Sequence, residues 1–510
     1  MNETRHFLPE GLLTLQVIAA ILALILIYTV STKDRPLAGI PLVSIEGKSP
    51  KESFLYHGIE TLAKGIRQHS GVFQVMTGTG PRVILPNRFA DELRNHPDLN
   101  FNKAFSRDFF SSYPGFEAIR QGLHDDALIQ ETVRVKLTQS LNFVTGDLVD
   151  ETTASLHDIL GEDTEWHTMT LRDDMMDLVA RLSSRVFLGK DICRNKRWLE
   201  IAKSYTTDLF VGSLLMRMAP PLLRPIAYWF IPQCTALRKA VRDAHQIIGP
   251  EVKRRKATID KARAAAEKPP RVADAIGWMY EVSRGRKVDY VAGQLALTFA
   301  AIHTTTDVTS QALFDICEYP DVAQQLREEI VEVFSACGLT KTSLYKLKLM
   351  DSFLKEGQRF RPRSATSMYR HLDQQVTLSD GTVLPKGSRV QVLGNFMDPE
   401  IYPEPTKFDA ARFLRMRESA GQENGWQFVT TSPEYTLFGH GQHACPGRFF
   451  ASNEVKIALC QLLLKYDWRF VPDIGRPAPQ LSELASGLDP KAQIQVRRRK
   501  EEMNLDDLAV

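Results

Sequence analysis

The first apolar stretch of the chain is long enough to cross a membrane. Residues 12–30 form a run of nineteen residues without a charge, and a helix of that length rises about 28 Å, close to the thickness of a hydrocarbon core. A cleaved signal peptide is the alternative, but its apolar run is usually only ~7–15 residues and ends in small residues. Here the charged segment 31–35 follows instead. The pattern therefore predicts a retained transmembrane anchor.

The charges on either side of this run predict its orientation. One arginine precedes it, next to two glutamates, whereas four basic residues follow it within the next two dozen positions. Because the basic flank usually stays in the cytosol, we expect residues 1–11 in the lumen of the endoplasmic reticulum and the bulk of the chain in the cytosol. Pro36 and Pro41 cannot continue the helix. Residues 31–45 are therefore predicted to form a stiff hinge before one large domain at residues 46–510.

The rest of the chain shows mostly helical spacing of apolar residues. Residues 123–334 are predicted to form successive helices with short connectors, and residues 322–334 show apolar positions at helical spacing opposite a charged face. Strand patterns are confined to two predicted hairpins, at residues 72–85 and 376–385, each broken by a turn that contains glycine. We therefore expect a mainly α fold with small β-sheets.

Two further stretches are harder to interpret. Residues 209–231 are rich in large apolar side chains but contain Pro220, Pro221 and Pro225, which exclude a second straight membrane span. Burial in the core and insertion of a loop into the membrane surface are both consistent with this composition. Residues 253–271 are basic and rich in alanine, and they are predicted to form an exposed helix end and a surface loop.

Composition and charge exclude several classes of protein. The 510 residues are 43% apolar and 25% charged, an ordinary globular composition that excludes a disordered or fibrous chain. Sixty-four basic and 61 acidic residues leave a net charge of only +3, so no nucleic-acid partner is expected. The six cysteines contain no CxxC pair, which argues against a disulfide scaffold or a cysteine-rich zinc module.

One cysteine stands in an unusual context. Cys445 lies in the glycine-punctuated segment 438–447, and an apolar helix is predicted directly after it at residues 449–464. Gly441 and Gly447 permit a positive φ, so the loop can turn back with its amides directed at the sulfur. The N-terminus of the following helix would favour the thiolate over the thiol. These features suit a soft metal ligand, of which haem iron is one possibility; a buried structural cysteine on a turn is the alternative.

Three segments together resemble the cytochrome P450 superfamily. Glu356 and Arg359 match the ExxR helix motif of that family, and residues 405–413 match its PxxFxxxRF segment. By this resemblance, Arg412 joins the first two residues in a buried triad that locks the core; an exposed i,i+3 pair is the ordinary alternative. The cysteine loop of the family is FxxGxxxCxG, and the chain matches it at four positions: Phe438, Gly441, Cys445 and Gly447. The resemblance extends over nearly the whole chain and implies the cytochrome P450 fold, with residues 46–510 as a haem-thiolate catalytic domain.

The resemblance also implies a cofactor and its ligands. Cys445 would be the axial thiolate of haem b, which favours O–O cleavage. The family usually has a basic residue two positions before the cysteine, to pair with a haem propionate, and this chain has His443 there. Arg370 resembles a second propionate-binding residue. Arg134 matches the arginine of the family's WxxxR helix, although Gln130 occupies the tryptophan position; a solvent-exposed Arg134 is the alternative.

The oxygen-activation helix departs from the family pattern. Residues 297–306 align with [AG]GxDTT, but Ala301 replaces the glycine and His303 replaces the acid. Thr304, with Thr305 beside it, keeps the hydroxyl position that is thought to relay protons; these threonines could instead bond to helix carbonyls. The imidazole of His303 titrates near neutrality and is predicted either to shuttle protons or to point away into a polar network.

The resemblance implies a function as well. The AAIHTT segment looks like that of fungal enzymes acting on terpenoids, including ent-kaurene oxidases and indole-diterpene or meroterpenoid oxygenases. We expect a membrane-anchored monooxygenase that oxidises a hydrophobic small molecule with O₂ and electrons from NADPH-cytochrome P450 reductase, with cytochrome b5 as a second candidate donor. The absence of a glycine-rich dinucleotide motif after a strand fits a separate reductase. A haem-thiolate isomerase, dehydratase or peroxide-dependent enzyme and a non-catalytic haem-binding membrane protein are the alternatives.

Overall fold

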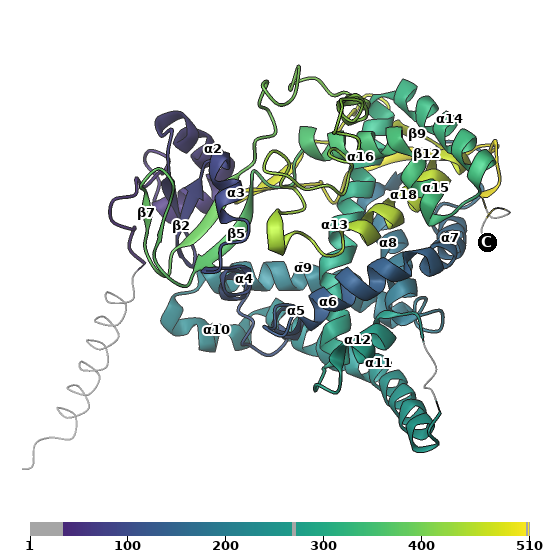
Figure 1. Cartoon of the computed structure of the whole chain (residues 1–510), viewed down its shortest axis with the longest axis horizontal. Helices are drawn as coiled ribbons and strands as arrows, with labels where there is room; N and C mark the ends of the chain where they lie inside the picture. Colours follow the sequence, from purple (N-terminus) through teal and green to yellow (C-terminus); the bar gives the residue numbers. More distant parts are fainter. Residues whose placement is uncertain (1–33, 268–271, 506–507, 509–510) are drawn as a thin grey trace, which may run out of the picture.

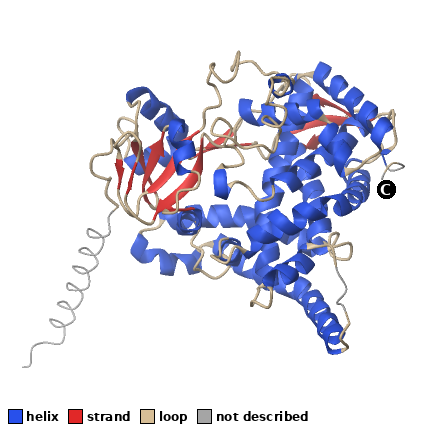
Figure 2. Ribbon diagram, in the orientation of Figure 1, coloured by secondary structure: helices blue, strands red, loops and turns tan. Residues whose placement is uncertain are grey.

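Helices make up most of the chain, and the strands gather into small sheets (Figures 1 and 2). The computed structural model describes residues 34–267, 272–505 and 508. The predicted anchor at 12–30 and the segment before it lie outside these residues. Within the described part of the chain, no helix combines the length and the apolar character needed to cross a membrane. The expected mainly α fold with small sheets is confirmed.

The helices and strands have the following bounds. The helices are α2 Pro50–Gln68, α3 Ala90–Leu93, α4 Phe101–Asp108, α5 Glu117–Gly122, α6 Leu128–Glu131, α7 Thr138–Leu160, α8 Leu171–Leu188, α9 Lys196–Met218, α10 Arg224–Phe230, α11 Pro232–Ala264, α12 Ala275–Ser283, α13 Tyr290–Glu318, α14 Pro320–Cys337, α15 Lys341–Lys346, α16 Lys348–Phe360, α17 Arg412–Met416 and α18 Arg448–Lys465, with the short turns η1 Asn87–Phe89, η2 Thr132–Leu137, η3 Pro221–Leu223 and η4 Gly441–His443. The strands are β1 Phe73–Thr77, β2 Gly80–Leu85, β3 Leu99–Asn100, β4 His167–Thr170, β5 Thr366–Leu372, β6 Val376–Thr377, β7 Val383–Leu384, β8 Arg389–Leu393, β9 Tyr466–Phe470, β10 Gln480–Ser482, β11 Ala485–Gly487 and β12 Gln493–Arg498.

The largest sheet has five strands in the order β1-β2-β8-β5-β3 and lies at one end of the molecule beside α2 (Figure 1). β1 and β2 form the first predicted hairpin, with Phe73 opposite Ile84. β6 and β7 form the second, with Val376 opposite Leu384. Both hairpin predictions are confirmed. A three-stranded sheet, β4-β12-β9, lies among the helices towards the other end.

The described part of the predicted hinge is attached to the large sheet. Pro41 accepts a hydrogen bond from the backbone of Gln74 at 2.8 Å, and Val43 donates one back at 2.9 Å. The buried Gln74 side chain donates to the carbonyls of Leu37 and Ile40. Residues 37–43 are therefore fixed to the edge of β1 and belong to the folded body, whereas the hinge was predicted to extend to residue 45.

Helix α13 runs through the centre of the helical part and contacts α5, α8, α9, α16 and α18 (Figure 1). Its first turn is capped by Asp289, whose side chain accepts a hydrogen bond from the Ala292 amide at 3.0 Å, which satisfies one of the free amides of the helix start. Polar residues of α13 such as Thr305 and Thr309 are nevertheless buried. This buried polar stripe places hydroxyl groups in the middle of the core.

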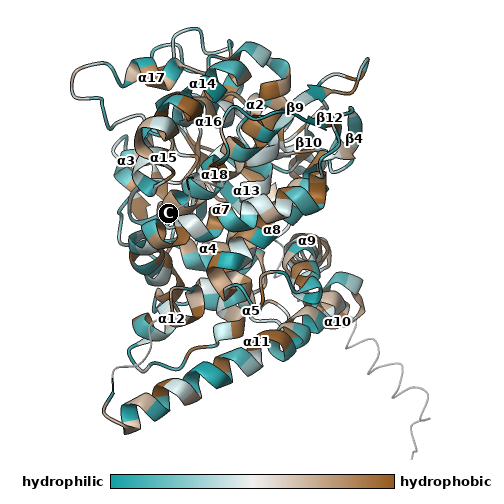
Figure 3. Ribbon diagram, turned by 90° about the vertical axis from the view of Figure 1, so that its right-hand side faces the viewer, coloured by the Kyte–Doolittle hydropathy of each residue, from teal (hydrophilic) through white to brown (hydrophobic). Residues whose placement is uncertain are grey.

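The apolar stretch 209–231 is only partly buried. α9 ends at Met218, before the prolines, and η3 and α10 follow, as the proline positions predict. Trp229 is 60% exposed and Phe230 is 80% exposed. α10 lies at the edge of the molecule beside α9 and α11 (Figure 3). The interpretation that this stretch is buried in the core is therefore wrong for α10. The described part of 253–271 is an exposed helix end, as predicted.

Candidate functional site

A cavity of about 610 Å³ lies between α13, the cysteine loop and the start of α18. We call it the haem chamber, after the cofactor predicted for Cys445. Aromatic and aliphatic side chains from α4, α5 and α13 form much of its wall. Eight of the predicted site residues line it: Arg134, Thr304, Thr305, Phe438, Gly441, His443, Cys445 and Gly447. The structure thus brings together residues that are more than 300 positions apart.

The cysteine loop closes on itself at the chamber. The Cys445 amide donates a hydrogen bond to the Phe438 carbonyl at 2.7 Å. Gly439 and Gly441 have φ of 72° and 74°, and a Cβ on Gly441 would lie 2.5 Å from the Arg94 carbonyl oxygen, so only glycine fits there. Gly447 has φ of −90°; the positive φ that its sequence position permits is not used, and Gly439 supplies the second left-handed turn instead.

The sulfur of Cys445 is subject to two opposing effects. The amides of Gly447 and Arg448, at the start of α18, favour the thiolate, as predicted, but burial is the larger effect and raises the pKa of the thiol above its ordinary value. A thiol in this position therefore loses its proton most easily when a metal cation binds the sulfur and compensates the buried negative charge.

Arg370 is a buried cation without an acidic partner. It lies on β5, is 2% exposed and donates from one nitrogen to the Tyr369 carbonyl at 2.8 Å. Its Nε and its other terminal nitrogen have no hydrogen-bond partner among the described residues. Burial alone lowers the pKa of Arg370 to about 10. A buried guanidinium with unsatisfied donors fits an anionic group supplied from outside the chain, such as a propionate of haem.

Two further predicted haem-binding groups line the chamber. His443 is half-buried, its Nε2 has no partner among the described residues, and its pKa is lowered to about 4, chiefly by burial and then by Arg370. Arg134 lines the chamber but is exposed to solvent, which was the alternative to a haem-binding Arg134. Together with Cys445, these donors fit haem, which needs a thiolate for its iron and cations or N–H groups for its two carboxylates.

The hydroxyl groups of Thr304 and Thr305 on α13 have different surroundings. The Thr304 hydroxyl lines the chamber and donates to the carbonyls of Ala300 and Ala301, at 2.8 Å and 3.1 Å, so it bonds to the helix and borders the chamber at once. Thr305 is 2% exposed, borders the chamber and also interacts with the carboxyl group of Glu454 on α18.

His303 points away from the chamber. Its Nε2 lies 3.0 Å from the Lys203 carbonyl, and its Nδ1 lies 3.2 Å from a guanidinium nitrogen of Arg172. A carbonyl can only accept and a guanidinium can only donate, so the ring carries its proton on Nε2 and is neutral. Burial is the largest cause of the lowered pKa of His303. This is the polar network that the sequence left as an alternative; His303 does not border the chamber.

The predicted triad is formed, and it is buried. Glu356 and Arg359 make two hydrogen bonds, at 2.7 and 2.8 Å, and Arg412 donates from Nε to the same carboxylate at 3.1 Å. Glu356 and Arg359 have no exposed surface and Arg412 is 4% exposed, which excludes the ordinary surface pair. Arg359 also donates to the Phe396 carbonyl at 2.6 Å, so the triad ties α16 to the start of α17 and to the loop after β8.

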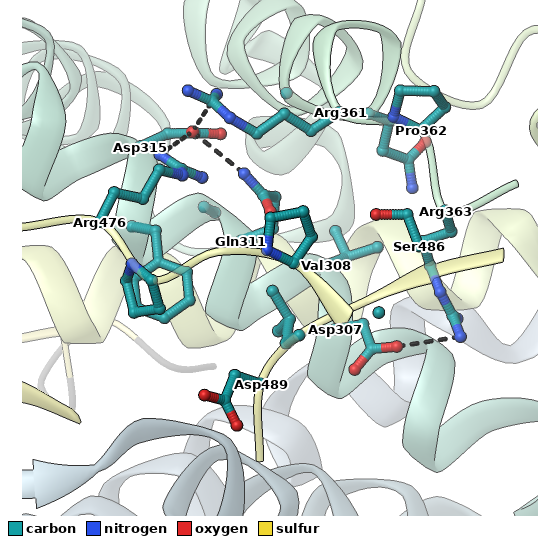
Figure 4. Close-up of a pocket in the computed structure, with 18 of the residues that line it drawn as sticks. Asp307, Val308, Gln311, Asp315, Arg361, Pro362, Arg363, Arg476, Ser486 and Asp489 are labelled. Carbon is teal, nitrogen blue, oxygen red and sulfur yellow. Dashed lines mark hydrogen bonds and ion pairs between the residues drawn. The ribbon is translucent and has the colours of Figure 1, made fainter. Parts of the chain in front are cut away.

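A second cavity of about 430 Å³ adjoins the chamber (Figure 4). The two share Val308, Gln358 and Arg363 in their walls. Asp307 pairs there with Arg363 at 2.9 Å and with Arg172 at 3.6 Å. Sequence reasoning missed both this cavity and Glu454. The available signals were Asp307 beside the threonines of α13, and Glu454 close to Lys456 on the otherwise largely apolar α18.

Comparisons with known proteins agree with this architecture. A family model described as Cytochrome P450 matches residues 72–496. The chain is 45% identical to Cytochrome P450 monooxygenase bsc2 of Alternaria brassicicola over 94% of this chain and 93% of that one. It is 40% identical to Cytochrome P450 monooxygenase adrA of Penicillium rubens over 94% and 95%.

A solved structure, retinoic acid bound cyanobacterial CYP120A1, superposes with a TM-score of 0.64 at 18% identity, over 90% of this chain and 99% of that one. That similarity supports the fold. With a family model over most of its length and fungal relatives at 40–45% identity, the chain belongs to the cytochrome P450 family of haem-thiolate monooxygenases.

Proposed function

We propose that this monooxygenase is anchored in the endoplasmic reticulum membrane, receives electrons from NADPH through a separate reductase, and oxidises an apolar, terpenoid-type intermediate of fungal secondary metabolism. The observation that carries the proposal is the shared chamber: Cys445 and Thr304 line one largely apolar cavity, and the buried guanidinium of Arg370 lies over the ring of Phe101 in its wall. The AAIHTT segment supports the terpenoid class.

The residues that would hold the cofactor are those with unmet donors or a free sulfur. Cys445 would supply the thiolate ligand of the haem iron, while Arg370, His443 and Arg134 would bind the carboxylates of haem. When bound, haem activates O₂ so that one oxygen atom enters the substrate and the other leaves as water, with two electrons and two protons consumed.

The remaining roles belong to the chain itself. Phe105, Phe299 and Ala300 line the chamber and keep bulk water from the reacting atoms. Thr304 holds a hydroxyl proton at the wall, positioned by the carbonyls of Ala300 and Ala301. The wall binds the substrate through its apolar surface, so affinity should follow the apolar area that the substrate buries.

The exposed face of α10 supports attachment to a membrane. Its apolar side chains would bury their surface in the acyl boundary, and Arg238, whose guanidinium lies over the Trp229 ring, would meet lipid phosphates beside them. The large exposed apolar residues of α10 are Ile226, Trp229 and Phe230, and Met218 at the end of α9 and Leu223 on η3 precede them. Together with the predicted anchor at 12–30, this face would hold the cytosolic domain against the bilayer.

The test is turnover of the full chain in membranes. The chain is expressed with and without NADPH-cytochrome P450 reductase and is given geranylgeraniol as a terpenoid probe, with dodecane as an apolar control. We expect an oxygenated product from geranylgeraniol that carries one atom of ¹⁸O₂ and requires both reductase and NADPH. Product formed with peroxide alone would favour the peroxide-dependent alternative. A haem spectrum without turnover of any terpenoid would contradict the proposed substrate class.

A further inference from the structure

A third cavity, of about 690 Å³, lies between the later turns of α11, the helix α12 and the first residue of α13. We call it the α11–α12 cavity; both helices lie at the lower edge of the molecule in Figures 1 and 3. Among the described residues, it shares no wall with the haem chamber or with the cavity beside that chamber. Its volume is within the range of about 300–1,000 Å³ that is usual for small-molecule sites. The proposed function gives it no role.

The walls of this cavity combine apolar and cationic side chains. One face of α11, with residues three or four positions apart, contributes Val252, Lys256, Ile259 and Arg263. The chain leading into and through α12, with residues four positions apart, contributes Val272, Ile276, Tyr280 and Arg284. An inward helix face is usually apolar throughout. Two faces that mix apolar and cationic positions around one cavity therefore suit a ligand that is itself amphiphilic.

Cations far outnumber acids on these walls. One acidic side chain, that of Glu281, lines the cavity, against six cationic ones: Lys136, Arg254, Arg255, Lys256, Arg263 and Arg284. Four of the six have an acidic partner: Lys136 pairs with Glu281, Arg254 and Arg255 with Glu251, and Arg284 with Glu131. Lys256 and Arg263 form no ion pair with any residue that the structure describes. These two cations are the ones available to an anion.

Tyrosine rings position both of these cations. The Lys256 ammonium lies 5.0 Å from the centre of the Tyr290 ring, and the Arg263 guanidinium lies 5.5 Å from the centre of the Tyr280 ring. A ring face attracts a cation without neutralising its charge. The buried Tyr280 hydroxyl also has no hydrogen-bond partner within residues 34–267, 272–505 and 508. The cavity thus keeps two positioned charges and one free hydroxyl.

We propose that the α11–α12 cavity binds an amphiphilic phosphate, a molecule with one phosphate group on an apolar chain. The phosphate accepts hydrogen bonds from Lys256 and Arg263, and the chain lies against Val252, Ile259 and Ile276. A phosphate monoester suits the two cations better than a carboxylate does, because it carries up to two negative charges and more acceptor oxygens. Binding makes and breaks no covalent bond.

Equilibrium dialysis of radiolabelled octyl phosphate tests the proposal. The full haem-loaded chain is held in nanodiscs of zwitterionic lipid, empty nanodiscs correct for partition into the lipid, and a haem-coordinating azole fills the haem chamber. We expect one octyl phosphate to bind per chain, with about tenfold or more weaker binding of octanol and of inorganic phosphate. Equal affinity for octanol would overturn the role of the cations. Equal affinity for inorganic phosphate would overturn the amphiphilic ligand.

Charge variants of α11 show whether the probe occupies this cavity. Lys256→Gln combined with Arg263→Gln should weaken the binding of octyl phosphate about tenfold or more. The matched control combines Lys253→Gln with Lys261→Gln, which removes the same charge from the same helix at positions outside the cavity wall. All four side chains are exposed, so both double variants should fold and load haem as the wild type does. Equal losses in the two would mean that α11 attracts phosphate only by its net charge, and would overturn the proposal.

A soluble metabolite and a membrane lipid could both supply this chemistry. Nanodiscs that contain phosphatidic acid are therefore compared with nanodiscs that contain the same fraction of phosphatidylserine, which is anionic but has no phosphate monoester. Weaker binding of octyl phosphate with phosphatidic acid alone would support the site and assign it to a lipid of the membrane. Equal binding in both would support the site and assign it to a soluble amphiphile. None of these measurements needs substrate turnover, so a failure of the proposed function would leave them unaffected.

Discussion

The side chains that matter most for haem binding are those that the protein leaves without partners. Arg370 is the clearest case, because a buried guanidinium with unsatisfied nitrogens is costly until an anion arrives. Arg389, whose guanidinium donates to Asp108 and Thr79, has no such capacity. The unsatisfied donors of Arg370 are therefore the ones that we expect to bind a carboxylate of the cofactor.

Arg370→Gln should weaken haem retention. A hydrogen bond to a charged group is typically worth ~1.5–3 kcal/mol, so we expect haem transfer to apomyoglobin to become about 10- to 100-fold more favourable. Arg134→Gln is the control, since an exposed ion pair contributes only ~0–1 kcal/mol and its effect should be several-fold smaller. Equal retention in wild type and Arg370→Gln would remove Arg370 from the haem site.

Substitutions of Thr304 and of His303 should have different effects on coupling, which is the amount of product formed per NADPH consumed. Thr304→Ala removes the hydroxyl that borders the chamber, so product per NADPH should fall and peroxide should rise. His303→Ala removes the hydrogen bonds that the ring makes with the Lys203 carbonyl and Arg172, and leaving such buried groups unsatisfied typically costs ~1–3 kcal/mol of stability, but coupling should stay as in the wild type. Uncoupling in His303→Ala to the level of Thr304→Ala would restore the predicted His303 relay.

At the scale of the elements, the triad fixes α16 against the segment that precedes the cysteine loop. Removing one partner of a buried ion pair typically costs ~3–5 kcal/mol, because the other charge is left uncompensated. Arg359→Ala should therefore abolish folded, haem-loaded protein, measured as ferrous-CO absorption per chain. Arg415→Ala is a suitable control, since its partner Asp409 and its own side chain are more exposed. Normal haem incorporation in Arg359→Ala would contradict this account.

The stability that Glu454 contributes between α18 and α13 should depend on pH. The pKa of Glu454 is raised from 4.5 to about 8 on folding, so its contribution to stability is complete below about pH 4.5 and is lost as pH rises towards 8. Relative to Glu454→Gln, the wild type should lose up to about 1.4 kcal/mol per pH unit in this window and nothing more above it. Unfolding in urea at several pH values measures this difference; a constant difference would mean that Glu454 is ionised in the folded protein.

Local patterns predicted the elements better than they predicted side-chain directions. A few consecutive residues were enough to predict the hairpins, the helix after Cys445 and the proline-broken stretch, because the spacing of apolar residues and the positions of glycine and proline are local features. The side of α13 that His303 occupies depends on Arg172 and Lys203, which lie 131 and 100 positions away in the sequence. The burial of Glu454 likewise depends on α8 and α13. Such contacts exist only after the helices pack, so no local pattern encodes them.

At the scale of the whole molecule, the α10 face and the predicted anchor should act together in membrane binding. Replacing Trp229 and Phe230 by serine removes two side chains that would each contribute roughly 1.5–3 kcal/mol on full burial. We expect the double variant to bind anionic vesicles at least tenfold more weakly, measured by flotation with residues 1–33 removed from both proteins. Val272→Ser and Tyr345→Ser, which change exposed apolar residues elsewhere, should bind as the parent does.

The central claim is that Cys445 is the thiolate ligand of haem in the chamber, and the ferrous-CO difference spectrum of Cys445→Ser tests it most directly. The account predicts that the wild type shows the absorption typical of thiolate ligation and that Cys445→Ser lacks it while circular dichroism still shows a folded protein. Cys337→Ser, a partly exposed cysteine on α14, should retain the wild-type spectrum. A thiolate spectrum that survives in Cys445→Ser would contradict the account.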